Sequence, residues 1–178
     1  MNEIFERHSY RGAYLPESVP RADLTKIMEA GLAAPSGCNK QTTSLIAVDD
    51  PALLAEIFAI MELSFCKSAP AVICVLTKRI VAYRDGWGKE RWYGVQDYAA
   101  AIENMLLEAV SLGYQSCWLE GHVTDADEQG KRIAALLGVP GEYQLVCVLP
   151  LGKAAEPLKT AKKRPFAERA WFNRFGQD

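Results

Sequence analysis

Two arginines and a hydroxyl lie close together near the amino terminus, in the pentapeptide RHSYR at residues 7–11. If this stretch is extended, Arg7, Ser9 and Arg11 project to one side, because side chains alternate along an extended chain. Two guanidinium groups and a hydroxyl on one side suit a phosphate or another anion. The alternative is a solvated charged face that follows a short helix.

A second polar stretch, PSGCNKQ at residues 35–41, is rich in turn-forming and amide residues and predicts a loop. Its backbone and amide groups could hydrogen-bond a flat heterocyclic ligand, or the loop is only a connection. The groups available for this are those of Ser36, Gly37, Asn39 and Gln41. Cys38 lies within the loop, but a single thiol without a predicted base nearby is more typical of packing than of redox chemistry.

Basic residues also gather near the carboxyl terminus, ahead of an aromatic end. The basic residues are Lys159, Lys162, Lys163 and Arg164, and the aromatic ones are Trp171, Phe172 and Phe175. A free tail would seldom carry so many aromatic side chains, so this segment is expected to dock on its own chain or on a neighbouring one.

The element expected to position these groups is a long helix from about residue 93 to residue 112. Its apolar residues recur at three- and four-residue spacing: Val95, Ala99, Ile102, Leu106, Ala109 and Val110. A helix of this length extends for roughly 30 Å and would cross the whole body, largely buried. Ala100 and Leu107 carry apolar surface onto its polar face, so the pattern fits an ordinary core helix or one with a second partner, such as another subunit.

Shorter elements are predicted around this helix. Strands are expected at 43–48, 69–77, 114–120 and 143–149, and helices at 2–6, at 20–34 and at 51–60, with a last one from about Ala126 to Leu137. Asn2 is expected to cap the first helix, and Pro150 and Gly152 to end the last strand. Residues 83–93 mix glycine, aromatic and charged residues, which suits a mobile surface loop or a lid over a pocket.

Length and composition narrow the class of protein. The chain has 178 residues, of which 49% are apolar and 24% charged, so we expect one ordinary globular domain. A net charge of −2 argues against nucleic acid as a partner, because proteins that bind nucleic acid usually carry a strong excess of basic residues. Five cysteines without CxxC spacing and two histidines form no metal-binding motif, so no metal is expected. No signal peptide and no membrane-spanning run is present, so we expect a cytoplasmic protein with no membrane partner.

Four stretches, in order along the chain, resemble the flavin-binding signature of the nitroreductase family: RHSYR, PSGCNKQ, WLEG and KKR. Residues 94–121 also resemble the family's helix and following strand, so the resemblance covers nearly the whole chain. It implies an α+β fold with a central mixed β-sheet flanked by helices, formed by residues 1–178 as a single FMN-binding domain. It also implies a homodimer with an exchanged C-terminal segment and FMN at the interface.

The resemblance assigns five residues to the FMN phosphate and ribityl chain: Arg7, His8, Ser9, Lys162 and Arg164. The FMN phosphate carries close to two negative charges, so several cations can share it through charge-assisted hydrogen bonds. Arg11 would reach the pyrimidine side of the flavin ring, where reduction places negative charge, and would stabilise that charge.

The resemblance places two further stretches at the flavin ring. Residues of the second stretch would flank the ring, from the same subunit or from the other: Pro35, Ser36, Gly37, Asn39 and Gln41. Leu119, Glu120 and Gly121 would lie at the N5 edge, with backbone N–H groups donating to N5 or O4. This suits a strand end, where ladder pairing stops and donors become free.

The chain departs from the family pattern at three places. Thr42 and Thr43 follow Gln41 where the family usually has proline and then an aromatic residue. The step from Arg164 to Pro165 is one residue shorter than is common, which leaves the register of Lys162, Lys163 and Arg164 open. Residues 77–93 are also fewer than in larger members, where this region carries helices that shape the substrate pocket.

The function that the resemblance implies is that of an FMN-dependent NAD(P)H oxidoreductase. Hydride would pass from NAD(P)H through flavin N5 to a small acceptor, such as a nitroaromatic or a quinone, in a ping-pong cycle that needs no catalytic side-chain acid or base. The alternatives are a flavin-binding storage or sensor protein with little turnover, and a flavin-dependent dehalogenase or dehydrogenase on the same fold. No ribose-recognition motif distinguishes NADH from NADPH.

Overall fold

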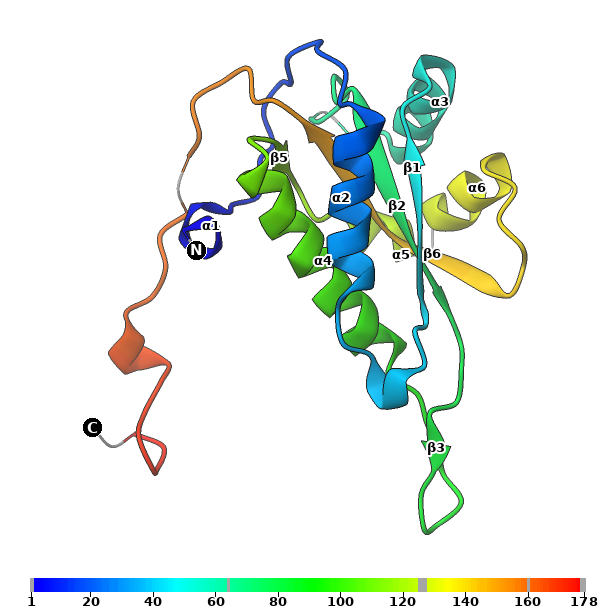
Figure 1. The fold of residues 1–178 in the computed structure, drawn as a ribbon, viewed down its shortest axis with the longest axis vertical. Coiled ribbons are helices and arrows are strands. Elements are labelled where there is room, and N and C mark those ends of the chain that lie inside the picture. Colours follow the sequence, from blue (N-terminus) through cyan, green and yellow to red (C-terminus); the bar gives the residue numbers. More distant parts are fainter. Residues whose placement is uncertain (1, 64, 125–127, 160, 177–178) are drawn as a thin grey trace.

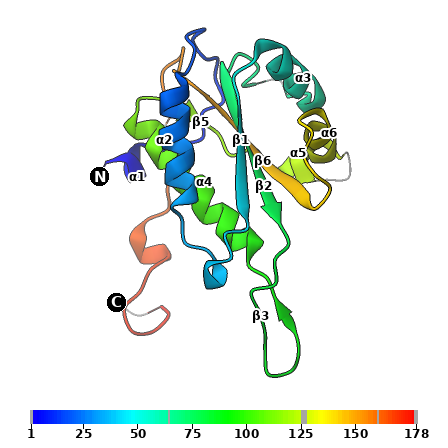
Figure 2. The same ribbon diagram turned by 45° about the vertical axis from the view of Figure 1, so that its right-hand side comes forward.

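The computed structural model describes residues 2–63, 65–124, 128–159 and 161–176. Its centre is a four-stranded sheet in the order β1 (Thr43–Val48), β2 (Ala71–Lys78), β6 (Tyr143–Gly152) and β5 (Gln115–Ser116). Helices α2 (Arg21–Leu32) and α4 (Gly94–Ser111) cover one face of the sheet, and α3 (Pro51–Met61), α5 (Gly121–Thr124) and α6 (Gln129–Leu136) cover the other (Figures 1 and 2). The fold is therefore a sheet between two helical layers.

The remaining elements are short and lie at the margins of these layers. Helix α1 (Glu3–Glu6) packs beside α4, and β3 (Tyr83–Arg84) pairs with β4 (Glu90–Arg91) in a separate hairpin. There are two short 3-10 turns among the described residues. The turn η1 (Gly37–Asn39) precedes β1, and the turn η2 (Phe166–Glu168) lies in the C-terminal segment. In the part of the chain that the structure describes, no helix combines the length and apolar character needed to span a membrane.

Strand β2 shows why the sheet needs helices on both faces. Its alternating residues are divided between two hydrophobic clusters, with Val72, Cys74 and Leu76 on the side of α3 and α6. Ala71, Ile73 and Val75 lie on the side of α2 and α4. A strand buried on both faces reads as a continuous apolar run, which is the pattern that predicted it.

Helices α2 and α4 approach each other closely because of a glycine. A Cβ atom at Gly31 would lie 2.7 Å from Cγ of Met105, so any larger residue would push the two helices apart. Near this contact, Asn104 Nδ2 donates a hydrogen bond of 3.0 Å to the carbonyl oxygen of Ala30. The long helix is thus fixed against its neighbour and against the sheet.

The expected α+β fold with a central sheet flanked by helices is confirmed. All paired strands run antiparallel, and the parallel component is an isolated bridge between Ser9 and Ser116. The strand predicted at 43–48 has the observed bounds, and that predicted at 69–77 becomes β2.

Several predicted details were wrong. The strand expected at 114–120 pairs regularly only over Gln115–Ser116, with an isolated bridge at Leu119. Pro150 does not end the last strand, because β6 continues through it to Gly152. Val95 is 51% exposed and so does not belong to the buried face of α4. Asn2 precedes α1 but its side chain makes no capping hydrogen bond.

The start of α6 and the form of residues 83–93 bear on two further expectations. Helix α6 begins at Gln129, and Ala126, where its start was expected, lies outside the described residues. Residues 83–93 form a hydrogen-bonded hairpin where a mobile loop was one of the two expectations. The C-terminal segment leaves the body of the protein in Figure 1, with Phe166, Phe172 and Phe175 exposed.

Candidate functional site

The pentapeptide RHSYR and the chain that follows β6 line one cavity of about 450 Å³. Four cations from these two distant stretches share it: Arg7, Arg11, Lys159 and Lys163. His8, Ser9 and Glu156 also contribute to its lining. Arg7, Ser9 and Arg11 therefore line one cavity together with the residues between them, and residues of the C-terminal basic stretch line it too.

Backbone pairing holds the two stretches in place. Ser9 forms a parallel bridge with Ser116 of β5, and the N–H of Tyr10 donates to the carbonyl of Ser116 at 2.9 Å. Further on, Tyr14 bridges Ala154 in the antiparallel sense. Pairing thus ties residues 9–14 and 154–155 to the framework, and Lys159 and Lys163 follow beyond these paired residues.

His8, which lines this cavity, has an unpaired polar atom. Its Nε2 atom is buried and has no hydrogen-bond partner among the described residues, and the same is true of the Ser116 hydroxyl. Buried polar atoms are nearly always paired, because leaving one unpaired costs about 1–3 kcal/mol. Arg7, with 21% of its side chain exposed, pairs with Glu103 of α4 at 3.2 Å.

A second, smaller cavity of about 210 Å³ adjoins the first through Arg11, which lines both. Its other walls are the turn Trp118–Gly121 and apolar side chains from the end of α3 and the segment after it: Met61, Leu63 and Phe65. The Arg11 guanidinium lies 6.0 Å from the centroid of the Phe65 ring. A cationic cavity thus continues into one with an aromatic and aliphatic wall.

The Glu120 carboxylate fixes this turn to the long helix. One oxygen accepts a hydrogen bond of 2.9 Å from the Tyr98 hydroxyl on α4, and the other accepts one of 2.7 Å from Trp118 Nε1. Burial, followed by the bond to Glu120, raises the pKa of Tyr98 to about 12. The phenol therefore remains a donor at every physiological pH.

The backbone donors of the turn are not equivalent. The N–H of Leu119 donates to the carbonyl of Val148 at 3.2 Å, so it is already engaged. Gly121 begins α5, where the first N–H groups have no partner within the helix. The expected donation toward a flavin edge consequently rests on Glu120 and Gly121 and no longer on Leu119.

Asp97 organises the second polar stretch and was missed in the sequence. It is 4% exposed, and its two oxygens accept bonds from the N–H of Gly37 at 2.8 Å and from the Thr42 hydroxyl at 2.7 Å. A carboxylate on the buried side of an amphipathic helix was the available signal, because a buried charge needs dedicated partners.

The loop that Asp97 holds is conformationally strained. Cys38, Asn39 and Gln41 have φ values of 51°, 52° and 48°, a region that residues other than glycine seldom occupy. The Tyr93 ring packs on Gly37 so closely that a Cβ atom there would lie 2.4 Å from it. Strain of this kind concentrates at functional sites.

Three residues of α4 hold three of the polar stretches: Asp97 the loop at 37–42, Tyr98 the turn at Glu120, and Glu103 the pentapeptide at Arg7. At roughly 100° per residue, these side chains leave the helix in three different directions. Neither cavity includes a residue of 35–41. Pro35, Ser36, Gly37, Asn39 and Gln41 therefore do not line the cationic site of their own chain.

The C-terminal cations differ in position from the predicted pair. All four of these cations are exposed; Lys159 and Lys163 line the larger cavity, whereas Lys162 and Arg164 lie outside its lining. The cavity lining favours Lys163 over Lys162 and Arg164, and the register stays a prediction. Contact of any of these residues with a phosphate stays a prediction.

Solved structures with this fold define the class of protein. A BluB-like flavoprotein from Clostridium difficile 630 aligns with a TM-score of 0.79 and 26% identity, covering 97% of this chain and 98% of its own. A nitroreductase with bound FMN from Bacteroides fragilis NCTC 9343 aligns at 0.75 and 29% identity, covering 97% of each chain. The class is that of the flavoprotein oxidoreductases with a sheet between helical layers.

Sequence comparison identifies the family. The model of the nitroreductase family matches residues 4–63 and 61–153. A protein of Archaeoglobus fulgidus named "Putative NADH dehydrogenase/NAD(P)H nitroreductase" is 34% identical over 152 residues, which are 84% of this chain and 82% of that protein. The chain belongs to the nitroreductase family, as its four motifs predicted.

Proposed function

We propose that the protein is an FMN-dependent oxidoreductase that takes a hydride from NAD(P)H and passes it to a small acceptor, such as a nitroaromatic or a quinone. The observation that carries the proposal is the pair of adjoining cavities joined by Arg11. One has the cations that a phosphate needs, and the other is bounded by the Trp118–Gly121 turn and by apolar side chains, as a ring edge would require.

FMN fits the residues present. Its phosphate carries close to two negative charges, and Arg7, Lys159 and Lys163 offer charge-assisted hydrogen bonds in the larger cavity. The unpaired Nε2 of His8 would find a partner on the phosphate or on the ribityl hydroxyls. Ser9 would add its hydroxyl from the same wall.

When bound, FMN supplies the redox chemistry, accepting two electrons and a proton as hydride from the nicotinamide and delivering them to the acceptor in a separate step. Arg11 stands where both cavities meet, and its fixed charge favours negative charge that develops on the ring. Glu120 and Gly121 hold backbone donors at the turn, which Tyr98 and Trp118 keep in position. Met61, Leu63 and Phe65 would give the ring an apolar wall.

The active unit in this proposal is a homodimer with an exchanged C-terminal segment. The loop at 35–41 does not line the cavities of its own chain, so in this proposal a second subunit supplies Pro35, Ser36, Gly37, Asn39 and Gln41 to the flavin ring. Exposed apolar side chains support a covered surface, among them Leu32 at 58% and Phe175 at 86%. The exchanged tail would bury its aromatic residues on that partner.

The visible spectrum of the FMN-loaded protein tests the function. NADH and then NADPH are added without oxygen, followed by a nitroaromatic or a quinone. We expect the bound flavin to bleach with one of the nicotinamides and to regain its colour with the acceptor. If FMN binds but neither nicotinamide bleaches it, the oxidoreductase assignment fails, and a flavin-binding protein with little turnover becomes the better description.

A further inference from the structure

The larger cavity contains a carboxylate as well as cations. Among the described residues that line it, Glu156 is the one acidic side chain, beside Arg7, Arg11, Lys159 and Lys163. In the described part of the chain, no ion pair joins Glu156 to any of these four cations. An ionised carboxylate only accepts hydrogen bonds, whereas guanidinium and ammonium groups only donate them. The cavity therefore offers a ligand an acceptor in addition to its donors.

Glu156 is fixed to the N-terminal stretch by both its backbone and its side chain. The Tyr10 hydroxyl accepts a hydrogen bond from the N–H of Glu156 at 3.2 Å and donates one to the carbonyl of Ala13. Glu156 Oε1 accepts in turn from the N–H of Ala13 at 3.3 Å. Gly12 lets the phenol lie close, because a Cβ atom there would be 2.6 Å from the Tyr10 hydroxyl oxygen. Among the described residues, Oε2 has no partner, so it is available to a ligand.

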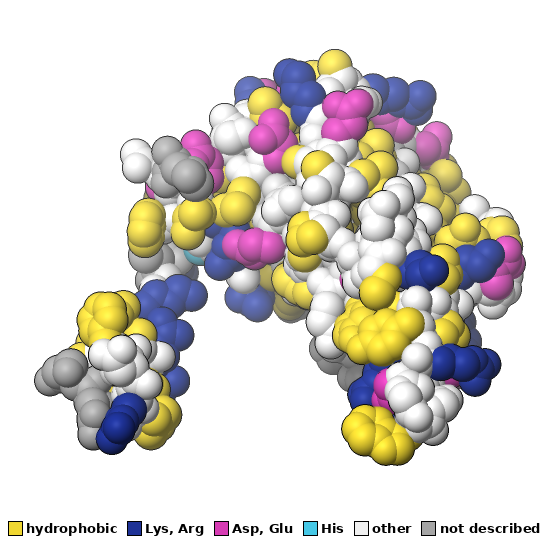
Figure 3. Space-filling view, turned by 60° about the horizontal axis from the view of Figure 1, so that its bottom comes forward, with side chains coloured by type: hydrophobic (Ala, Val, Ile, Leu, Met, Phe, Trp, Pro, Cys, Tyr) yellow, Lys and Arg dark blue, Asp and Glu magenta, His cyan; other side chains and the backbone are white. Residues whose placement is uncertain are grey.

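The two stretches that line the cavity run in opposite directions, which gives the cavity an order. Tyr14 bridges Ala154 in the antiparallel sense, so the chain after Ala154 returns along the chain before Tyr14. Glu156 follows this bridge at once, near the end of the cavity where Arg11 also lines the smaller cavity. Lys163 comes later in the returning chain, and Figure 3 shows Lys and Arg side chains gathered where the C-terminal segment leaves the body. A ligand that extends from the smaller cavity would therefore meet Glu156 before it meets Lys163.

FMN has groups in the matching order. Its ribityl chain, which carries hydroxyl groups, lies between the ring and the phosphate. A hydroxyl can donate to a carboxylate in a charge-assisted hydrogen bond, whereas a phosphate next to the same carboxylate would be repelled. With the ring in the smaller cavity and the phosphate among the cations, the part of FMN beside Glu156 would be the ribityl chain.

We infer that Glu156 is a binding residue that accepts a hydrogen bond from a ribityl hydroxyl of FMN through Oε2. The inference rests on the proposed function, because it takes FMN as the ligand of the two cavities. Cations alone would hold any flavin that carries a phosphate. The carboxylate adds a preference for a flavin whose chain is a polyol, and Tyr10 is the residue that positions it.

A comparison of two ligands in two proteins tests this role. The ligands are FMN and an analogue with a 5-phosphopentyl chain at N10, which keeps the ring and the phosphate but has no hydroxyl groups. Each is titrated into the full-length protein freed of flavin, and flavin fluorescence gives the Kd. Glu156→Ala should weaken FMN binding by about tenfold or more, the loss of one hydrogen bond to a charged group. The Kd of the analogue should stay the same or fall, because the carboxylate only repels its phosphate.

The opposite results are equally distinct. If Glu156→Ala weakens both ligands by the same factor, Glu156 only braces the cavity and the inference is wrong. Unchanged affinity for FMN would also overturn it. The matched control is Glu17→Ala, which removes an exposed carboxylate that pairs with Lys153 at 2.6 Å and lies outside the cavity lining. Both Kd values should stay at the wild-type level in this control.

Tyr10→Phe tests the positioning of the carboxylate. This change removes the hydroxyl that accepts from the N–H of Glu156, and it leaves the carboxylate itself in place. FMN binding should weaken by about threefold, less than in Glu156→Ala, with the analogue unaffected. An equal loss for both ligands would show that the hydroxyl supports the cavity as a whole, which contradicts the positioning role.

These titrations separate the inference from the proposed function, because they need no turnover. If no nicotinamide reduces the bound flavin, the redox function fails, yet a loss of affinity confined to FMN in Glu156→Ala still supports the contact. If the flavin is reduced normally but the wild-type protein binds FMN and the analogue equally well, the contact is rejected and the redox function stands.

Discussion

Arg7 and Lys163 are the residues whose removal tests the proposed phosphate contact most directly. Both line the larger cavity, and they come from opposite ends of the chain. We predict that Arg7→Ala combined with Lys163→Ala weakens FMN binding by about 2–4 kcal/mol, because each change removes a charge-assisted hydrogen bond. Fluorescence titration of the apoprotein with FMN measures this loss.

The matched control removes the two cations that flank Lys163 in the sequence. Lys162→Ala with Arg164→Ala removes as much basic charge from the same segment, but from side chains outside the cavity lining. Its effect on FMN affinity should be small. If this pair costs more than the loss of Lys163 alone, the family register predicted from the sequence holds and the contact with Lys163 is wrong.

Asp23 illustrates a residue whose chemistry is structural. Its Oδ2 accepts a bond of 2.8 Å from the Tyr114 hydroxyl, and this bond, followed by that from Lys26, lowers the pKa of the Asp23 carboxyl. A pKa below the unfolded value of about 4 contributes stability above pH 4, which is lost as the pH falls through the folded pKa.

The pH dependence of Tyr114→Phe tests this assignment. Without the hydroxyl, the free energy of unfolding should fall less steeply between about pH 5 and pH 3 than in the wild type. Urea unfolding at a series of pH values measures the slope. Asp23→Asn, which removes the titrating group, should be flatter still. A wild-type slope in Tyr114→Phe would show that the hydroxyl does not hold the carboxylate.

At the scale of elements, the loop at 37–42 depends on one side chain of α4. Asp97→Ala should lower the free energy of unfolding by about 3 kcal/mol, because the Gly37 N–H and the Thr42 hydroxyl lose a charged acceptor while the strained backbone remains. Urea unfolding gives the magnitude, and hydrogen exchange at the Gly37 amide reports the local loosening.

Thr42→Val is the control for this prediction. It removes one of the two bonds to Asp97 and leaves the anchor of Gly37, so it should cost about 1 kcal/mol and leave exchange at Gly37 nearly unchanged. If Thr42→Val costs as much as Asp97→Ala, the carboxylate supports the strand entrance and not the loop.

Hydrophobic periodicity predicted the elements that bury apolar residues. It failed where the bounds of a strand depend on which neighbouring strand pairs with it. Strand β1 was found in full because Thr43–Val48 carries its own pattern. The prediction that Pro150 ends the last strand was wrong. On that edge of β6, β5 pairs with Leu151 and Gly152, and Leu119 bridges Val148. Pro150 lies in the gap between these contacts, where the missing N–H of a proline costs little. The motifs predicted Arg7 and Arg11 at the cavity. Asp97 was signalled only by its place on the buried side of the helix, and Tyr98 and Glu103 gave no signal because their partners lie far away in the chain.

For the whole molecule, the exposed C-terminal aromatic residues predict association. Phe172 is 68% exposed and Phe175 86%, a cost that burial on a second subunit would remove. We expect a dimer at micromolar concentration, and we expect removal of residues 171–178 to weaken it. Sedimentation velocity measures both. A stable monomer that retains FMN would contradict the model of a site shared between subunits.

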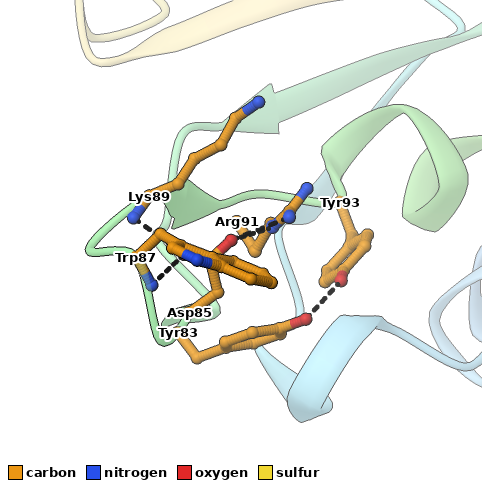
Figure 4. Close-up of polar contacts among 6 residues, drawn as sticks. All are labelled: Tyr83, Asp85, Trp87, Lys89, Arg91 and Tyr93. Carbon is orange, nitrogen blue, oxygen red and sulfur yellow. Dashed lines mark hydrogen bonds and ion pairs between the residues drawn. The ribbon is translucent and has the colours of Figure 1, made fainter.

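The spacing of Asp97, Tyr98 and Glu103 on α4 also has a consequence for how such a chain can change in length. One residue inserted between Tyr98 and Glu103 would rotate everything beyond it by roughly 100°, and the pentapeptide would lose its partner. The hairpin is different, because its ladder closes below the tip (Figure 4), so residues can be added at Trp87 without turning α4. Insertions and deletions should therefore be tolerated at the tip of the β3–β4 hairpin and excluded from the first turns of α4.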